Sequence, residues 1–220
     1  GLPTILKKIG TAIGAAFAVG KLEPFGMGNQ SPVFGIFDAT LEKTIATRDG
    51  NHLKLLCKKN GNTFQAMLFN VSPQRFDYLP GDKIDLAVTL NVNFYQERYN
   101  LSVQVKAIKM SGVDQDQYFN EKIKFDDFMA GNDTDFADIF PDRAEVATIY
   151  KMIVASPQKV ERIKKIGTAI GYAKTQIAIN TLCELGIISE NNGFLVGNNT
   201  EQKTTLLNSK LYKELYERKK

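Results

Sequence analysis

The sequence predicts a mixed β and α protein, in which a five-stranded barrel is followed by a small helical domain with a two-stranded wing. Three observations lead to this prediction. Apolar and polar residues alternate from Pro32 to Met110, as expected of half-buried strands. A helical period replaces this alternation from Ile139 onward. Between these two bodies lies an acidic connector, residues 111–138.

The alternation is clearest in KIDLAVTLNVNF, residues 83–94. Its apolar side chains fall on one face and its polar side chains on the other, which indicates a half-buried strand. The dipeptide Asn60–Gly61 separates two shorter apolar runs and predicts a tight hairpin. Five strands with one irregular insert after the third favour an OB-fold, and a β-sandwich is the alternative. The other strands are expected at residues 33–47, 51–59, 62–70 and from Leu101 onward.

A barrel of this kind holds oligonucleotides on its second and third strands and on the loops after strands one and four. In this sequence those places carry basic and aromatic residues. Basic groups follow phosphates, and aromatic rings stack on unpaired bases for about 1–3 kcal/mol each. The alternative is that the rings pack in the core and the lysines are merely solvated. The predicted DNA-binding residues are Arg48, His52, Lys54, Lys58, Lys59, Phe94, Tyr95, Arg98 and Tyr99.

Residues 139–220 predict a winged-helix-like domain. One helix is expected after Pro141–Asp142, and a second after a cap and first turn at Ser156–Pro157. A third helix, from Lys174 to a stop at Gly186, would be the recognition helix. It would expose few polar side chains, so DNA contact and protein contact both stay open. These side chains are Lys174, Gln176, Asn180 and Glu184, and a wing (189–202) and a last helix (205–220) follow.

The net charge of +4 conceals a split along the chain. Residues 1–110 carry 13 basic and 8 acidic side chains, a net of +5. Residues 111–145 carry 3 and 10, a net of −7, whereas residues 146–220 carry 12 and 6, a net of +6. Each basic body can therefore face a polyanion, while the acidic connector cannot; ordinary solvated surface is the alternative.

The two cysteines, Cys57 and Cys183, lie far apart in apolar patterns and predict reduced, buried thiols in a cytoplasmic protein. No apolar run reaches the roughly 18 residues of a membrane span. No membrane partner is therefore expected.

The octapeptide KKIGTAIG occurs twice, at residues 7–14 and 164–171. The second copy lies within the predicted winged helix. The first would form a short helix before the barrel, within an N-terminal region of residues 1–31. The sequence offers no physical explanation for the identity of the two copies.

The stretch LEPFGMGNQSPVF (22–34), followed by NHLKLLCKKNG and FQAMLFN, resembles the RecJ family of bacterial single-stranded-DNA exonucleases. In that family a PFGxGNPxPxF elbow opens the oligonucleotide-binding barrel, and an HLKL strand follows. Gln30–Ser31 replaces the usual continuation of the elbow. IFPDRAEVATIYKMI (139–153) and LCELGII (182–188) are similar to the extra C-terminal domain of RecJ proteins from low-GC Gram-positive bacteria.

The resemblance implies that the elbow is the hinge between the barrel and a catalytic core that is missing from this chain. Packing of Phe25 within the chain itself is the alternative. The start at Gly1 instead of Met agrees with this expectation. The elbow residues are Pro24, Phe25, Gly26, Gly28 and Asn29.

RecJ proteins hydrolyse DNA with carboxylates and histidines, including an Asp-His-His run, that hold two metal ions, Mg or Mn. This sequence has one His and no such run, so we expect no catalytic residue, no metal site and no cofactor in the chain. The resemblance implies the DNA-binding part of a 5′-to-3′ exonuclease of repair and recombination. Its partners would be single-stranded DNA and the catalytic domains; a docking module for single-strand-binding protein is the alternative.

Overall fold

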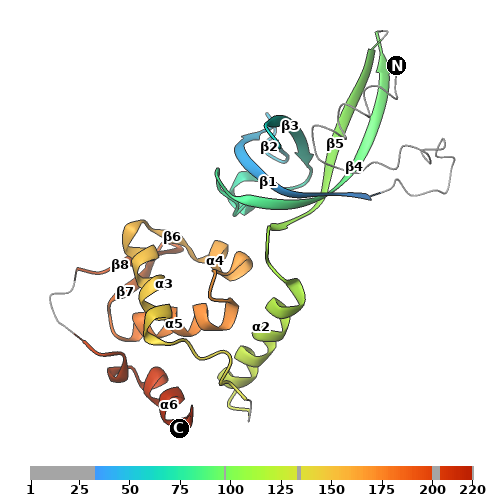
Figure 1. Cartoon of the computed structure of the whole chain (residues 1–220). Coiled ribbons are helices and arrows are strands. Elements are labelled where there is room, and N and C mark those ends of the chain that lie inside the picture. Colours follow the sequence, from blue (N-terminus) through green and yellow to red (C-terminus); the bar gives the residue numbers. More distant parts are fainter. Residues whose placement is uncertain (1–32, 97, 133–134, 200–203, 220) are drawn as a thin grey trace. The chain divides into compact units, whose positions relative to one another are not determined.

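The computed structural model describes residues 33–96, 98–132, 135–199 and 204–219. They divide into two compact units, with the boundary between Gly112 and Val113 (Figure 1). The N-terminal helix, the elbow residues and the first KKIGTAIG copy lie outside the described residues. No helix within the described ranges is both long enough and apolar enough to span a lipid bilayer.

The first unit is a closed barrel with the strand order β1-β2-β3-β5-β4. Neighbouring strands are antiparallel except β3 and β5, which pair in parallel at Met67 and Gln104. This arrangement confirms the predicted OB-fold-like barrel and excludes the β-sandwich. The elements are β1 (Val33–Ala46), β2 (Leu53–Lys59), β3 (Asn62–Leu68), the 3₁₀ turn η2 (Pro73–Arg75), β4 (Lys83–Tyr95) and β5 (Arg98–Met110).

The barrel interior is filled by alternate residues of each strand. On β2, Leu53, Leu55 and Cys57 are all fully buried. Burial raises the pKa of the Cys57 thiol to about 12, so this thiol stays protonated. The other cysteine, Cys183, is free but exposed, contrary to the prediction. The hairpin turn at Asn60–Gly61 is confirmed, since both residues have positive φ angles, 49° and 77°.

Strand β1 is long and bent, as predicted, because it pairs with β4 in its first half and with β2 in its second. The register shifts at two places, between Ile36 and Ala39 and between Leu41 and Lys43. Asp38, at φ 54°, donates its backbone N–H to Oδ1 of Asp85 at 2.8 Å. A bulge of this kind bends a strand, which lets β1 close the barrel.

Strands β4 and β5 continue beyond the barrel as a two-stranded ribbon (Figure 1). They pair from Ile84 and Met110 to Tyr95 and Arg98, whereas β1 pairs with β4 only as far as Thr89.

The second unit contains helices and a three-stranded sheet with the order β6-β8-β7. Part of the acidic connector forms helix α2, whose Phe128 is buried in the core of this unit. The elements are α2 (Gln115–Met129), α3 (Arg143–Ala155), β6 (Gln158–Lys159), α4 (Val160–Ile166), α5 (Tyr172–Glu184), β7 (Ile188–Asn191), β8 (Phe194–Gly197), η3 (Leu206–Asn208) and α6 (Lys210–Lys219).

The start of α4 differs from the prediction. Ser156 is the C-terminal cap of α3 and not the N-terminal cap of the next helix. Gln158 and Lys159 instead pair with Leu195 and Phe194 of β8. These two residues join the sheet because β8 offers them backbone partners, which the local sequence does not reveal.

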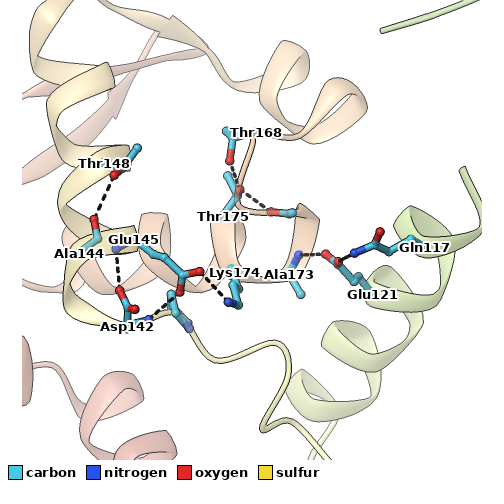
Figure 2. A network of polar contacts seen from close by, with 12 residues as sticks. Gln117, Glu121, Asp142, Ala144, Glu145, Thr148, Thr168, Ala173, Lys174 and Thr175 are labelled. Carbon is cyan, nitrogen blue, oxygen red and sulfur yellow. Dashed lines mark hydrogen bonds and ion pairs between the residues drawn. The ribbon is translucent and has the colours of Figure 1, made fainter. Parts of the chain in front are cut away.

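Helix α5 is the centre of the second unit. Eight of its 13 residues are buried, among them Ile177, Ala178 and Leu182. Figure 2 shows how its first turn is covered from two sides. Glu145 of α3 accepts a hydrogen bond from Nζ of Lys174 at 2.6 Å, and Glu121 of α2 accepts one from the backbone N–H of Ala173 at 3.2 Å.

A remote carboxylate caps the last helix, α6. Glu184, predicted to lie on an exposed recognition face, accepts hydrogen bonds from Oγ of Ser209 at 2.7 Å and from the backbone N–H groups of Lys210 and Leu211. These donors, with the Ser209 hydroxyl contributing most, lower the pKa of Glu184 below its usual value. In the structure Glu184 therefore caps α6.

Replacement of Glu184 by alanine is expected to destabilise the helical unit by about 0.5–2 kcal/mol, the usual cost of losing a cap. Because its pKa is lower in the folded state, Glu184 stabilises the fold above its ordinary pKa, and this contribution is lost as the pH falls. Chemical denaturation at neutral and at acidic pH tests this. Glu184→Ala should lose less stability on acidification than the native chain, and an equal loss in both would contradict the assignment.

Candidate nucleic-acid interface

The outward face of β2 carries the lysines that the sequence singled out. Lys54 and Lys58 alternate with the buried residues of the strand, and Lys58 is exposed. Strand pairing places Ile45 of β1 opposite Lys54, and Lys43 of β1 opposite Leu56. The outward face therefore gathers the side chains of Lys43, Lys54 and Lys58 on two adjacent strands, β1 and β2.

Lys59 does not belong to this set. It has the same parity as Leu53, Leu55 and Cys57, which point into the barrel, so the strand directs it to the opposite side from Lys58. The sequence-based prediction placed both lysines in one site, but a one-residue step along a strand reverses the face.

The loop between β1 and β2 holds Arg48, which is exposed, and His52, whose side chain is 28% exposed. His52 has a structural role. Its Nδ1 accepts a hydrogen bond from the backbone N–H of Asn70 at 3.0 Å, and its ring contacts Phe69 edge-on at 5.1 Å. This histidine therefore fastens the first loop to the segment that follows β3.

The four remaining predicted residues lie in the β4–β5 ribbon. Strand pairing continues to the tip, so that Phe94 is opposite Tyr99, and Tyr95 is opposite Arg98. The prediction already had Phe94 at the end of a strand, but it placed Arg98 in the turn that follows, whereas Arg98 begins β5. Their position matches the connection between strands four and five that OB-folds use to hold oligonucleotides.

Basic side chains on the barrel face are largely free of acidic partners. Among the described residues, no ion pair is formed by Lys43, Arg48, Lys54, Lys58 or Arg75. Helices of the second unit differ, since several of their described cations lie within 4.0 Å of a carboxylate. These pairs are Lys124–Asp138, Lys164–Glu161, Lys174–Glu145, Lys213–Glu217 and Arg218–Glu214.

Sequence reasoning missed three residues that the fold brings to this interface. Lys43 lies beside the lysines of β2, and the alternation of β1 around its bulge obscures that position. Phe69, which is 43% exposed, and Arg75 follow β3 in a segment that the sequence marks only as a loop. The sequence indicates the β2–β3 hairpin, but only the pairing of Leu53 with Leu68 shows that Phe69 and Arg75 lie near the start of β2.

Comparison with known families identifies the barrel. Residues 12–107 match the family model of the RecJ OB domain. The sequence of the barrel is therefore similar to the RecJ OB domain. No curated protein matches the chain. The family match ends before the helical unit begins at Val113, so the identification concerns the RecJ OB domain alone.

Solved structures similar to the chain include RecJ from Thermus thermophilus in complex with Mn²⁺, at 20% identity and a TM-score of 0.31. The match covers 51% of this chain and 14% of that one, so the matched part is a small share of that RecJ. The second single-stranded-DNA-binding protein of Mycobacterium smegmatis is 17% identical, with 36% and 84% covered and a TM-score of 0.30. The second OB-fold domain of replication protein A from Methanococcus maripaludis is 18% identical, with 39% and 88% covered and a TM-score of 0.25.

The resemblance to RecJ implies two metal ions in that family, and a group of side chains would be needed to bind each of them. Within the described ranges, no group of three or more His, Cys, Asp or Glu side chains is placed to hold a metal ion.

Proposed function

We propose that the RecJ OB domain of this chain binds single-stranded DNA. On this proposal the chain is the non-catalytic, DNA-binding portion of a RecJ-like 5′-to-3′ exonuclease that acts in repair and recombination in the cytoplasm, and the catalytic domains, with Mg or Mn, are its partners. The observation that supports it best is the row of cations without an ion-pair partner among the described residues, Lys43, Lys54 and Lys58, on the face that OB-folds use for oligonucleotides.

The physical basis is the exchange of counterions for protein cations. A cation that already neutralises a carboxylate gains little from a phosphate, whereas an unpaired lysine releases a condensed counterion when it binds one. The predicted residues Tyr95, Arg98 and Tyr99 are proposed to add stacking and charge. These two contributions, charge and stacking, favour an unpaired strand, because duplex bases are already stacked on each other.

The experiment that tests this proposal is fluorescence anisotropy of the whole chain with labelled single-stranded and duplex oligonucleotides over a series of salt concentrations. We expect tighter binding of the single strand and an affinity that falls steeply with salt. Equal affinity for both forms, or absence of binding at low salt, would overturn the proposal.

A second function is favoured by a groove in the helical unit. We propose that residues 139–220 form a winged helix that docks a protein. The first turn of α5 is covered by α2 and α3, since Tyr172 contacts Tyr118 and Lys174 is paired with Glu145. A helix covered in this way is poorly placed to enter the major groove of DNA.

The groove lies between α3 and the segment of η3 and α6. Exposed Tyr150, Leu207 and Tyr216 line it, and Arg143 is the one charged residue among its described lining residues. An apolar groove beside a cation fits a partner segment that carries bulky apolar side chains and carboxylates. Single-strand-binding protein is the candidate partner, and its recruitment would bring the exonuclease to its substrate.

Replacement of Tyr150 and Leu207 by serine is expected to weaken binding of purified single-strand-binding protein at least tenfold, because exposed aromatic and aliphatic anchors dominate such interfaces. Calorimetry with the whole chain measures it. Binding of bare single-stranded DNA by the same variant should stay at the native level. Unchanged affinity for single-strand-binding protein would remove the groove from consideration.

A further inference from the structure

The loop after β1 and the segment after β3 meet at one end of the β2–β3 hairpin. They meet because Leu53 at the start of β2 pairs with Leu68 at the end of β3, so the residues just outside the two strands converge. The hydrogen bond from the Asn70 N–H to Nδ1 of His52 joins the two segments. Phe69 lies next to this bond and is 43% exposed, although its neighbours on β3 face the core or the interface.

A polar depression opens beside this junction. Its lining residues are Asn51, His52, Asn70, Ser72 and Arg75. They supply amide, hydroxyl and guanidinium donors, and no carboxylate lines the depression among the described residues. The Arg75 guanidinium forms no ion pair with any described residue, and Arg75 is exposed.

Asp49 lies beside this junction, with its Oδ2 3.8 Å from Nε2 of His52. This carboxylate is occupied by its own loop, because it accepts hydrogen bonds from the Thr47 hydroxyl and the Asn51 backbone N–H. The Thr47 bond, the larger of the two effects, lowers the pKa of Asp49, so the carboxylate is charged at neutral pH. It repels an anion near His52 but leaves the side of Asn70, Ser72 and Arg75 open.

An exposed ring beside a cluster of donors with an unpaired guanidinium matches the chemistry of one nucleotide. A base stacks on a ring, and a guanidinium fork grips a phosphate with two parallel hydrogen bonds. The rings of Phe69 and His52 meet at 69° and so are not stacked on each other, which leaves ring surface for a base.

We propose that Phe69, Asn70, Ser72 and Arg75, positioned by His52, form a one-nucleotide subsite, with the base on Phe69 and its phosphate at Arg75. The inference rests on the proposed binding of single-stranded DNA and extends the interface beyond β2 and the ribbon to the segment after β3. The bound DNA strand then runs from the lysines of β2 past the loop between β1 and β2. Its nucleotide beside Phe69 and Arg75 occupies the proposed subsite.

Two variants of the whole chain separate the two halves of the subsite, with oligo-dT as the probe. Phe69→Leu should bind about tenfold more weakly with an unchanged salt slope, because it removes stacking but no charge. Arg75→Gln should reduce the salt slope by about 0.7, the value of one phosphate contact on a single strand. Thermal unfolding confirms that each variant is folded.

His52 provides a second readout that needs no variant, since it is the chain's one histidine. Its ring resonance in the NMR spectrum should shift on addition of oligo-dT and saturate at the same DNA concentration as the anisotropy. If the chain binds oligo-dT but both variants bind like the native chain and the His52 resonance stays in place, the subsite is refuted and DNA binding stands. If the chain does not bind oligo-dT at all, the proposed function itself fails.

Discussion

A chain in which Lys43, Lys54 and Lys58 are replaced by alanine is expected to bind single-stranded DNA roughly 50-fold more weakly at about 0.15 M salt. The reason is counterion release, in which each phosphate contact on a single strand contributes about 0.7 to the slope of log K against log salt. Three lost contacts reduce the slope by about 2. All three lysines project from the outward face of β1 and β2, where their removal creates no cavity.

The charge control is a chain with Lys122 and Lys151 replaced by alanine, which removes two of the three positive charges that the first variant loses. Both residues are exposed on helices of the second unit, so the control lowers the net charge without changing the barrel. It should keep an affinity within about twofold of the native chain, because neither lysine belongs to the barrel face that the proposal assigns to DNA. Equal weakening by both variants would mean that net charge, and not the barrel face, attracts the DNA.

The barrel was predictable because its signals are local. Alternation in residues 83–94 and the Asn60–Gly61 turn fix strands and hairpins without any knowledge of distant contacts. Pro141–Asp142 did the same for the start of α3, where Asp142 and Glu145 form a capping box in the structure. Each of these features depends on residues a few positions apart, where spacing alone determines the geometry.

The interface was predictable only in part because its members are joined by long-range pairing. Lys54 and Lys58 could be found from the alternation of their own strand, but Arg75 and Phe69 reach the site only through the pairing of β2 with β3. The contacts that cover the predicted recognition helix were missed for the same reason. Glu121 bonds to Ala173 in the first turn of α5, although the two residues are 52 positions apart in the sequence. No local pattern indicates that contact.

The same contact gives a physical reason for a glycine in the second KKIGTAIG copy. Gly171 begins α5 with φ 93° and ψ 165°, a combination that is essentially confined to glycine. A Cβ placed there would lie 2.6 Å from Oε2 of Glu121. The turn between α4 and α5 therefore ends at a residue without a side chain. The carboxylate of Glu121 occupies the space that a Cβ would fill and accepts a hydrogen bond from the N–H of Ala173.

Replacement of Gly171 by alanine is expected to destabilise the helical unit by about 1–3 kcal/mol, the cost of a backbone region that only glycine adopts readily, and the loss of the Glu121 contact at this turn would add to it. Chemical denaturation of the whole chain, followed by a probe of each unit, measures this. The barrel should unfold at an unchanged denaturant concentration, since it has a core of its own.

The combination with Glu121→Ala separates the two causes. Removal of the carboxylate relieves the clash but not the backbone strain, so Gly171→Ala should cost less in the Glu121→Ala background than in the native chain. An equal cost in both backgrounds would show that the backbone conformation alone requires glycine. A negligible cost in the native chain would mean that the turn adopts another conformation. The covering of α5 by α2, which supports the proposed protein-docking role of this unit, would then have to be abandoned.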